Sequence, residues 1–181
     1  MTQKVKTRLM NGDDIDRSLT RMALQIVEHN HGVENLAIIG IYTGGVYLAR
    51  RIQQLIQEQF GISLPAGSLD ITLYRDDWSL ASQNPVVKKT SIDFSLQDKV
   101  VVLVDDVVYT GRTIRAALDA IMDLGRPRCI QLAALVDRGG RELPIQADYI
   151  GLDVQVGLGE HVHVLLREHD GSDEVVLVQQ G

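Results

Sequence analysis

One stretch in the middle of the chain, residues 100–113, constrains the fold most strongly. Its first part, residues 100–104, is a run of apolar and mostly β-branched side chains, which is typical of a strand buried on both faces of a parallel sheet. Two carboxylates, Asp105 and Asp106, follow where such a strand leaves the core, and a turn at residues 110–113 precedes a helical pattern. This order of strand, acid pair, glycine-bearing turn and helix predicts an α/β fold with the motif at the carboxyl end of a strand.

The same stretch favours the binding of a phosphorylated sugar. Ligands of open α/β sheets bind outside the carboxyl ends of the strands, and backbone N–H groups at the start of a helix attract anions. The phosphate of such a sugar would lie on the turn at residues 110–113, and its hydroxyls or a bound cation would lie against Asp105 and Asp106. A solubilising strand end, or half of a helix N-cap, is the alternative for the acid pair. The glycine spacings of P-loop and dinucleotide-binding motifs are both absent from the sequence.

Strands and helices are expected to alternate along the chain, which predicts a parallel, doubly wound sheet flanked by helices. The expected strands are at residues 5–9, 36–41, 69–73, 100–104 and 130–136, with a further strand that starts near residue 148. The expected helices have apolar stripes at residues 15–27, 46–60 and 114–122, and Gly32, Gly61 and Gly125 close them. In the tail, apolar alternation on both sides of a turn at residues 170–172 predicts a β-hairpin.

Composition bounds the class of protein. The chain has 181 residues, of which 45% are hydrophobic and 23% charged, and we expect one soluble globular domain over residues 1–181. No apolar run is long enough to cross a membrane, no secretory leader is apparent, and the single cysteine excludes an internal disulfide, so we expect a cytoplasmic protein. The net charge of −6, without blocks of lysine or arginine, argues against strong non-specific binding of nucleic acid.

A second glycine-bearing turn lies between a predicted strand and a predicted helix, at Thr43, Gly44 and Gly45. Such a turn can direct several successive backbone N–H groups at an anion. A tight loop that simply requires glycine is an equally good interpretation of the spacing.

Residues 75–98 form a polar stretch without periodicity, which includes Arg75 and the basic pair Lys88 and Lys89. A loop of this length inside one domain is uncommon and often serves as a lid or binding loop. A lid that carries Arg75 and the two lysines would suit closure over a pyrophosphate. A disordered insert is the alternative.

Residues 101–113 closely resemble the phosphoribosyl-pyrophosphate signature of type I phosphoribosyltransferases. Nearly the whole chain resembles the bacterial family of pyrimidine-operon attenuation regulators that are also uracil phosphoribosyltransferases, the PyrR family. The segments that carry this second resemblance are residues 69–77, 119–127, 136–139 and 141–145. The resemblance implies the type I phosphoribosyltransferase fold with a lid at about residues 75–98, a small hood at about residues 137–160 and a C-terminal β-hairpin. It also implies a homo-oligomer.

The activity implied by the resemblance is phosphoribosyl transfer from phosphoribosyl pyrophosphate (PRPP) to uracil, which gives uridine monophosphate (UMP) and pyrophosphate. UMP or UTP would be product or effector, and Mg²⁺ would be the cofactor, held by Asp105 and Asp106 through water. The implied catalytic residues are Arg75, Asp105 and Asp106. The implied PRPP-binding residues are Thr43, Gly44, Gly45, Asp105, Asp106, Tyr109, Thr110, Gly111, Arg112 and Thr113. The implied uracil-binding residues are Val136, Asp137, Arg138, Tyr149 and Ile150, with the aromatic ring covering one face of the base.

The RNA-binding side of the resemblance is weaker. Its candidate residues are Thr20, Arg21, Arg138 and Arg141. In the pyrophosphate turn, members of the family commonly have arginine at the position of Gly44, so this chain lacks a charge-assisted contact there. At the positions associated with RNA binding, they commonly have basic side chains where this chain has Leu24, Gly140, Gln146 and Leu152. Because phosphate contacts dominate RNA affinity, we expect binding to a pyrimidine-operon mRNA leader to be weakened. The alternatives to a uracil transferase are an RNA-binding regulator that only senses uridine nucleotides, and a purine transferase, which the pair Gly44 and Gly45 would fit.

Overall fold

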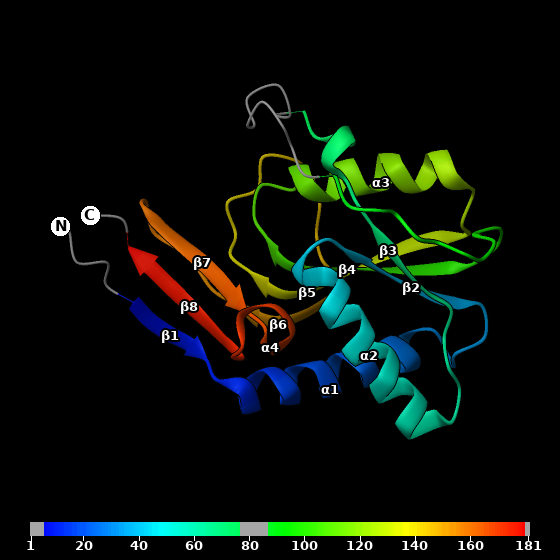
Figure 1. Cartoon of the computed structure of the whole chain (residues 1–181), viewed down its shortest axis with the longest axis horizontal. Coiled ribbons are helices and arrows are strands. Elements are labelled where there is room, and N and C mark those ends of the chain that lie inside the picture. The colour runs from blue at the N-terminus through cyan, green and yellow to red at the C-terminus, as the bar shows by residue number, and fades with distance from the viewer. Residues whose placement is uncertain (1–5, 77–86, 180–181) are drawn as a thin grey trace.

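The computed structural model describes residues 6–76 and 87–179 (Figure 1). Its centre is a five-stranded sheet with the order β3-β2-β4-β5-β6, in which every neighbouring pair is parallel. The strands are β2 (Leu36–Ile41), β3 (Ala66–Leu69), β4 (Val100–Val108), β5 (Cys129–Asp137) and β6 (Tyr149–Asp153). Helices α1 (Gly12–His29) and α2 (Gly44–Phe60) cover one face, and α3 (Arg112–Leu124) covers the other (Figure 1). The predicted doubly wound α/β fold is confirmed.

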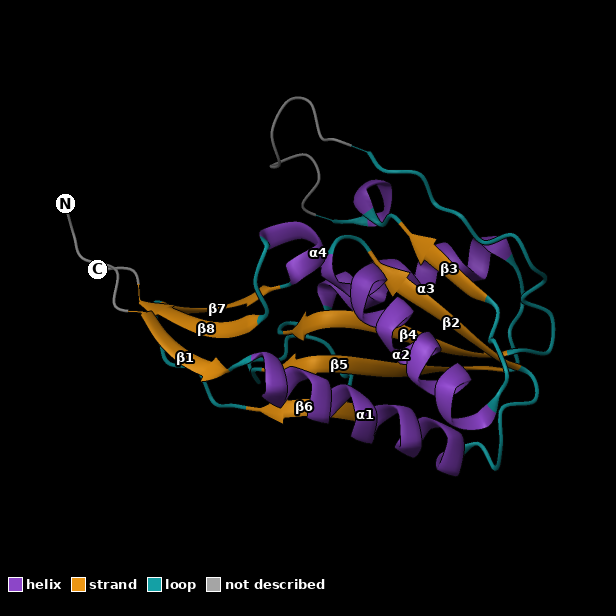
Figure 2. Cartoon of the chain, turned by 60° about the horizontal axis from the view of Figure 1, so that its bottom comes forward, coloured by secondary structure: helices purple, strands orange, loops and turns teal. Residues whose placement is uncertain are grey.

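A smaller antiparallel sheet completes the chain, with the order β1-β8-β7. Its strands are β1 (Lys6–Met10), β7 (Glu160–Leu165) and β8 (Glu174–Gln179), and the one-turn helix α4 (Arg167–Asp170) joins β7 to β8. The predicted C-terminal hairpin is confirmed, whereas the pairing of β1 with β8 was not predicted. Figure 2 shows the arrowheads of β4, β5 and β6 pointing toward this sheet, which therefore lies beyond their carboxyl ends.

The central strand β4 explains why an unbroken apolar run marks this fold. Val100, Val102 and Val104 pack in the cluster formed with α1 and α2, whereas Val101 and Leu103 pack in the cluster formed with α3. A strand with helices on both faces needs apolar side chains at every position, because neither face meets water. The expectation of a strand buried on both faces is confirmed.

Two predicted strand boundaries were wrong. β4 continues through Asp105 and Asp106 to Val108, because β5 is long enough to pair with it along that whole length. The strand expected at residues 69–73 ends at Leu69, and a 3₁₀ turn (Thr72–Tyr74) follows. The cause is Asp70, whose carboxylate accepts hydrogen bonds from the backbone N–H and the hydroxyl of Thr72 and so turns the chain.

The segment expected to form a lid is described only in part. Residues 77–86 lie outside the described residues. Residues 87–98 return along the edge of the large sheet, where Ser91 and Ser68 exchange two backbone hydrogen bonds of 2.9 Å. Leu96 is buried, and Ile92 and Phe94 pack against the α3 side of the core. This half of the segment is therefore part of the folded domain.

Arg51 of α2 joins the parallel domain to the C-terminal elements. Its side chain is 9% exposed and pairs with Glu168 at 2.6 Å and with Asp173 at 2.7 Å. Hydrogen bonding from Arg51 lowers the pKa of Glu168; burial acts to raise the pKa of Asp173, but Arg51 and a backbone N–H outweigh it and lower this pKa as well.

Replacing Arg51 by Met is expected to destabilise the fold by about 3 kcal/mol, because it leaves two carboxylates without their partner. Both carboxylates have folded-state pKa values below their ordinary 4.5 and 3.8, so the stabilisation is present above those values and is lost as the pH falls through the lower, folded-state values. Thermal and urea unfolding at pH 7 and pH 3.5 measure both effects. Arg50→Met, at an exposed neighbouring position, is the control; equal stability of the two variants at pH 7 would contradict this prediction.

Candidate active site

The two aspartates of the central motif lie at the carboxyl end of β4. Asp105 is only 5% exposed, and Asp106 is half-buried. Asp105 accepts a hydrogen bond of 2.9 Å from the backbone N–H of Asp106, and Asp106 accepts one of 2.8 Å from that of Val107. Burial raises the pKa of the Asp105 carboxyl well above its usual range, and the neighbouring charge of Asp106 raises this pKa further. A cation beside the pair would relieve the repulsion.

A cavity of about 340 Å³ opens between this strand end and the start of α3, and we call it the first cavity. Gly111, with a φ of 92°, directs the chain from β4 into α3, whose first-turn N–H groups lie at the cavity. The residues that line it are Arg75, Asp76, Asp105, Val107, Val108, Tyr109, Thr110, Gly111, Arg112, Thr113, Ile114 and Glu142. The turn predicted to hold a phosphate therefore does lie beside Asp105.

The side chain of Arg112 has carboxylate partners at the mouth of the first cavity. Its guanidinium donates to Glu142 at 2.6 Å and also to Asp76. Neither acid was among the predicted site residues. A phosphate in this cavity would meet the N–H groups and hydroxyls of the turn directly, and it would have to compete with the two carboxylates for Arg112.

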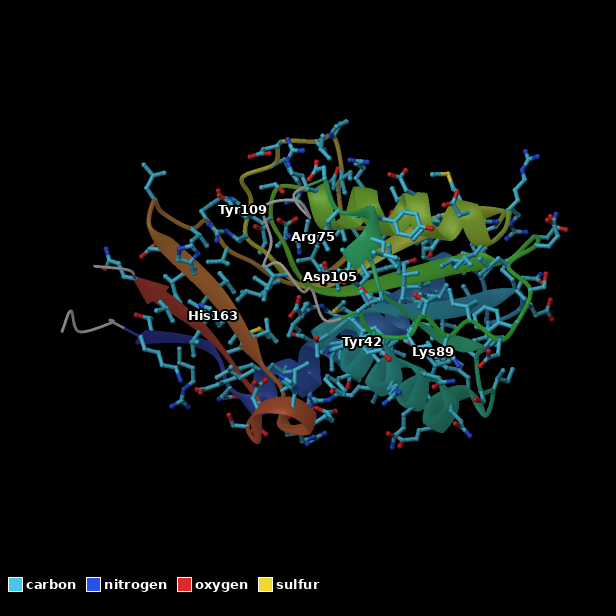
Figure 3. All side chains as sticks on the ribbon, turned by 45° about the horizontal axis from the view of Figure 1, so that its top comes forward. Tyr42, Arg75, Lys89, Asp105, Tyr109 and His163 are labelled. Carbon is cyan, nitrogen blue, oxygen red and sulfur yellow. The ribbon has the colours of Figure 1, made fainter. Side chains whose placement is uncertain are left out.

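A second cavity, of about 350 Å³, lies on the other side of the aspartates. The residues that line it are Tyr42, Thr43, Asp70, Ile71, Thr72, Arg75, Lys88, Asp105, Asp106, Val107 and Thr113. Arg75, Asp105, Val107 and Thr113 line both cavities, so the two adjoin. In Figure 3, Tyr109, Arg75, Asp105 and Tyr42 follow one another across this edge of the sheet. The structure thus brings most of the predicted PRPP-binding residues together.

Gly44 and Gly45 allow α2 to start directly against β4. A Cβ atom on Gly44 would lie 2.5 Å from a carboxylate oxygen of Asp106, and one on Gly45 would overlap the carbonyl oxygen of Val104. The contact at Gly45 is with backbone that cannot move aside, so this position requires glycine for steric reasons, whereas the contact at Gly44 is with the end of a side chain, that of Asp106. The same contact sets the first turn of α2 beside the acid pair, where its N–H groups can face an anion. The helix was predicted to start at Val46, two residues later than it does.

The expected hood begins where β5 ends. Asp137 accepts hydrogen bonds from Arg141 at 2.6 Å and from the backbone N–H of Gly139 at 3.0 Å. Burial acts to raise the pKa of Asp137, but these donors outweigh it and lower the pKa. Arg138 stacks on the ring of Tyr109, with 3.8 Å from the guanidinium carbon to the ring centre. This stack holds a flat aromatic surface at the wall of the first cavity.

The prediction that the ring of Tyr149 covers the base was wrong. Tyr149 is 3% exposed and lies in the core on the α1 side, where its hydroxyl donates to Gln131 at 2.8 Å. The register explains the error: Tyr149 pairs with Ala133, whereas the residue level with Asp137 at the carboxyl edge is Asp153. Ile150 lies one position beyond Tyr149 and lines neither cavity.

The side chains proposed to contact RNA have partners within the chain. Arg21 donates to the backbone carbonyls of Ile150 and Gly151 at 2.9 and 2.8 Å, which caps the outer edge of β6. Thr20 donates to the carbonyl of Asp16. Arg141 donates to Asp137 and to the carbonyls of Tyr109 and Ile145, so it ties the hood to the turn of the first cavity. Arg21 and Arg141 therefore form hydrogen bonds that hold elements of the fold together.

Comparison with known proteins gives a consistent result. Residues 7–165 match the phosphoribosyl transferase domain family. A protein from Deinococcus radiodurans named bifunctional protein PyrR is 54% identical over 95% of this chain and 94% of its own length, and one of the same name from Clostridioides difficile is 54% identical over 95% and 97%. Among solved structures, a Trypanosoma cruzi hypoxanthine phosphoribosyl transferase is similar in fold, with a TM-score of 0.73 at 16% identity over 99% of this chain and 94% of that one. The chain therefore belongs to the phosphoribosyl transferase family and, within it, to the PyrR proteins.

Proposed function

We propose that this protein is a uracil phosphoribosyltransferase that makes UMP and pyrophosphate from uracil and PRPP. The observation that carries this proposal is the pair of adjoining cavities around one acid pair, of which Asp105 is buried, with a helix N-terminus at each cavity. PRPP has a phosphate at one end and a pyrophosphate at the other, so two anion sites on either side of two carboxylates match its charge distribution. The naming of close relatives as PyrR supports a pyrimidine rather than a purine as the base.

In this proposal, Thr110, Gly111, Arg112 and Thr113 hold the 5′-phosphate, and Thr43, Gly44, Gly45 and Arg75 face the pyrophosphate. Asp105 and Asp106 hold the ribose hydroxyls. Val136, Asp137 and Arg138 remain the candidates for uracil, through backbone groups at Val136 because its side chain is buried, with Tyr109 as a flat surface beside Arg138. Tyr149 and Ile150 are not part of the proposed base site, because neither lines the first or the second cavity.

The proposed reaction forms a bond between uracil N1 and C1′ of the ribose and breaks the bond from C1′ to the pyrophosphate oxygen. The electron pair of that bond leaves with pyrophosphate, and the uracil proton passes to water or to the leaving group. The sugar carbon passes through an oxocarbenium-like state, as in other glycosyl transfers. The chain contributes chiefly by holding both reactants in line and by placing hydrogen-bond donors around the leaving group.

The acid pair also fits a bound Mg²⁺. Carboxylate oxygens are the ligands that this ion prefers, and Mg²⁺ usually takes only one or two carboxylates and completes its shell with water and substrate phosphates. Asp105 and Asp106, with the hydroxyls of Thr43, Thr72 and Thr113 around the second cavity, provide such a polar, oxygen-lined setting. When bound, Mg²⁺ would neutralise charge on the departing pyrophosphate.

The direct test of base specificity is a pyrophosphate-release assay with PRPP, Mg²⁺ and one of four bases: uracil, hypoxanthine, guanine or orotate. We expect turnover with uracil alone. The double variant Asp105→Asn/Asp106→Asn should lose about 100-fold or more in kcat/KM, because it removes the charges that face the ribose and the cation. Turnover with a purine in place of uracil would contradict the proposed base.

Asp105→Asn alone is expected to raise stability while it lowers activity. The folded-state pKa of Asp105 lies above its ordinary 3.8, so its unfavourable burial is absent below that value and grows as the pH rises toward the folded pKa. The variant should therefore unfold at a higher temperature than wild type at pH 8, by about 2–4 °C for each kcal/mol relieved. The two melting temperatures should converge near pH 4. A lower melting temperature for the variant at pH 8 would contradict this reading of the site.

Reduced binding to RNA is the second part of the proposal, and the engagement of Arg21 and Arg141 within the chain supports it. A gel shift with a pyrimidine-operon leader hairpin should give only weak binding, with a Kd of about 10⁻⁴ to 10⁻⁶ M that unrelated RNA competes equally. Tight binding relieved only by the specific hairpin would instead make regulation a retained function of this chain.

A further inference from the structure

Residues 88–91 are held in a fixed position beside the second cavity. Ser91 exchanges two backbone hydrogen bonds with Ser68, and the hydroxyl of Thr90 accepts one of 3.0 Å from the backbone N–H of Asp70. The backbone N–H of Lys88 donates to the carboxylate of Asp70. The hydrogen bonds of Lys88, Thr90 and Ser91 to Ser68 and Asp70 therefore fix the backbone position of Lys88.

From that position, the side chain of Lys88 reaches the first residues of α2. Its ammonium nitrogen donates to the hydroxyl of Thr43 at 2.7 Å and lies 5.1 Å from the centre of the Tyr42 ring. It also lines the second cavity with Asp105 and Asp106. The contact is between a side chain and a turn that lie far apart in the sequence, so nothing in the local sequence of either segment indicates it.

The charges around the second cavity indicate what the ammonium could bind. Its lining includes three carboxylates, those of Asp70, Asp105 and Asp106, and two cationic side chains, Arg75 and Lys88. The turn at residues 42–45 has no charged side chain of its own. A cation at its hydroxyl and a helix N-terminus beside it favour a strongly anionic group at this point.

We infer that Lys88 is a pyrophosphate-binding residue, whose ammonium group contacts the pyrophosphate of PRPP and of the departing product. This inference rests on the proposed function. A lysine ammonium has three donors, so it can keep its bond to Thr43 and still donate to phosphate oxygens. As the bond between C1′ and pyrophosphate breaks, negative charge grows on the leaving group, and the contact with Lys88 strengthens.

The test compares Lys88→Met with Lys89→Met. Lys89 is the matched control because it is the neighbouring lysine, is exposed and lines neither cavity. In Figure 3, Lys89 lies on the far side of Tyr42 from Asp105. The measurements are the KM for PRPP, the KM for pyrophosphate in the reverse reaction, and calorimetric affinities for UMP and for pyrophosphate with Mg²⁺. Lys88→Met should weaken the binding of PRPP and of pyrophosphate about tenfold or more, because a charged hydrogen bond is lost.

The affinity for UMP distinguishes a direct contact of Lys88 with pyrophosphate from a role of Lys88 in holding the structure of the site. UMP has no pyrophosphate, so Lys88→Met should leave its affinity unchanged within about twofold, and Lys88→Arg should restore most of the pyrophosphate affinity. Equal KM values for PRPP in Lys88→Met and Lys89→Met would overturn the inference, as would a parallel loss of UMP affinity. Calorimetry with pyrophosphate does not depend on turnover, so it decides the role of Lys88 even if uracil proves to be the wrong base.

Discussion

The close contact between the start of α2 and the end of β4 is the constraint on which this site depends. Gly45 lies so near the carbonyl of Val104 that no side chain fits there, and Gly44 lies against the carboxylate of Asp106. Gly40 of β2 meets the same helix start, because a Cβ atom there would overlap the carbonyl oxygen of Gly45. Gly40 and Gly45 therefore let a helix N-terminus lie against an acid pair, where its N–H groups can face an anion.

The site is arranged at a cost to the fold. Asp105 is buried next to a second carboxylate, which is unfavourable until a cation or a hydrogen-bonding ligand arrives. Elsewhere, the protein forms ion pairs that hold the surrounding elements: Arg51 joins α2 to the C-terminal sheet, and Arg141 joins the hood to the turn before α3. The acid pair is thus held in an unfavourable environment by a frame that is stabilised independently, as is common for functional sites.

Sequence patterns predicted the layers of this fold well, because a strand buried on both faces needs an unbroken apolar run, as β4 has at residues 100–104. They predicted the turn between β4 and α3 equally well, because strand, turn and helix are contiguous there. They failed where the answer depended on pairing between distant segments. The place of Tyr149 depends on the register of β6 against β5, and the contact of Lys88 with Thr43 depends on the path of residues 88–91 along β3. The side chain of Asp70, which ended a strand that alternation had predicted to continue, acts through a local turn that competes with the strand.

The two-cavity arrangement makes a geometric claim about how the donor substrate lies. A crystal structure of the protein with PRPP and Mg²⁺ tests this claim most directly. We predict that the 5′-phosphate lies on the turn at residues 110–113, that the ribose hydroxyls face Asp105 and Asp106, and that the pyrophosphate lies at Thr43 within reach of Lys88. A donor bound in the opposite direction, or outside these two cavities, would contradict the assignment of the two anion sites.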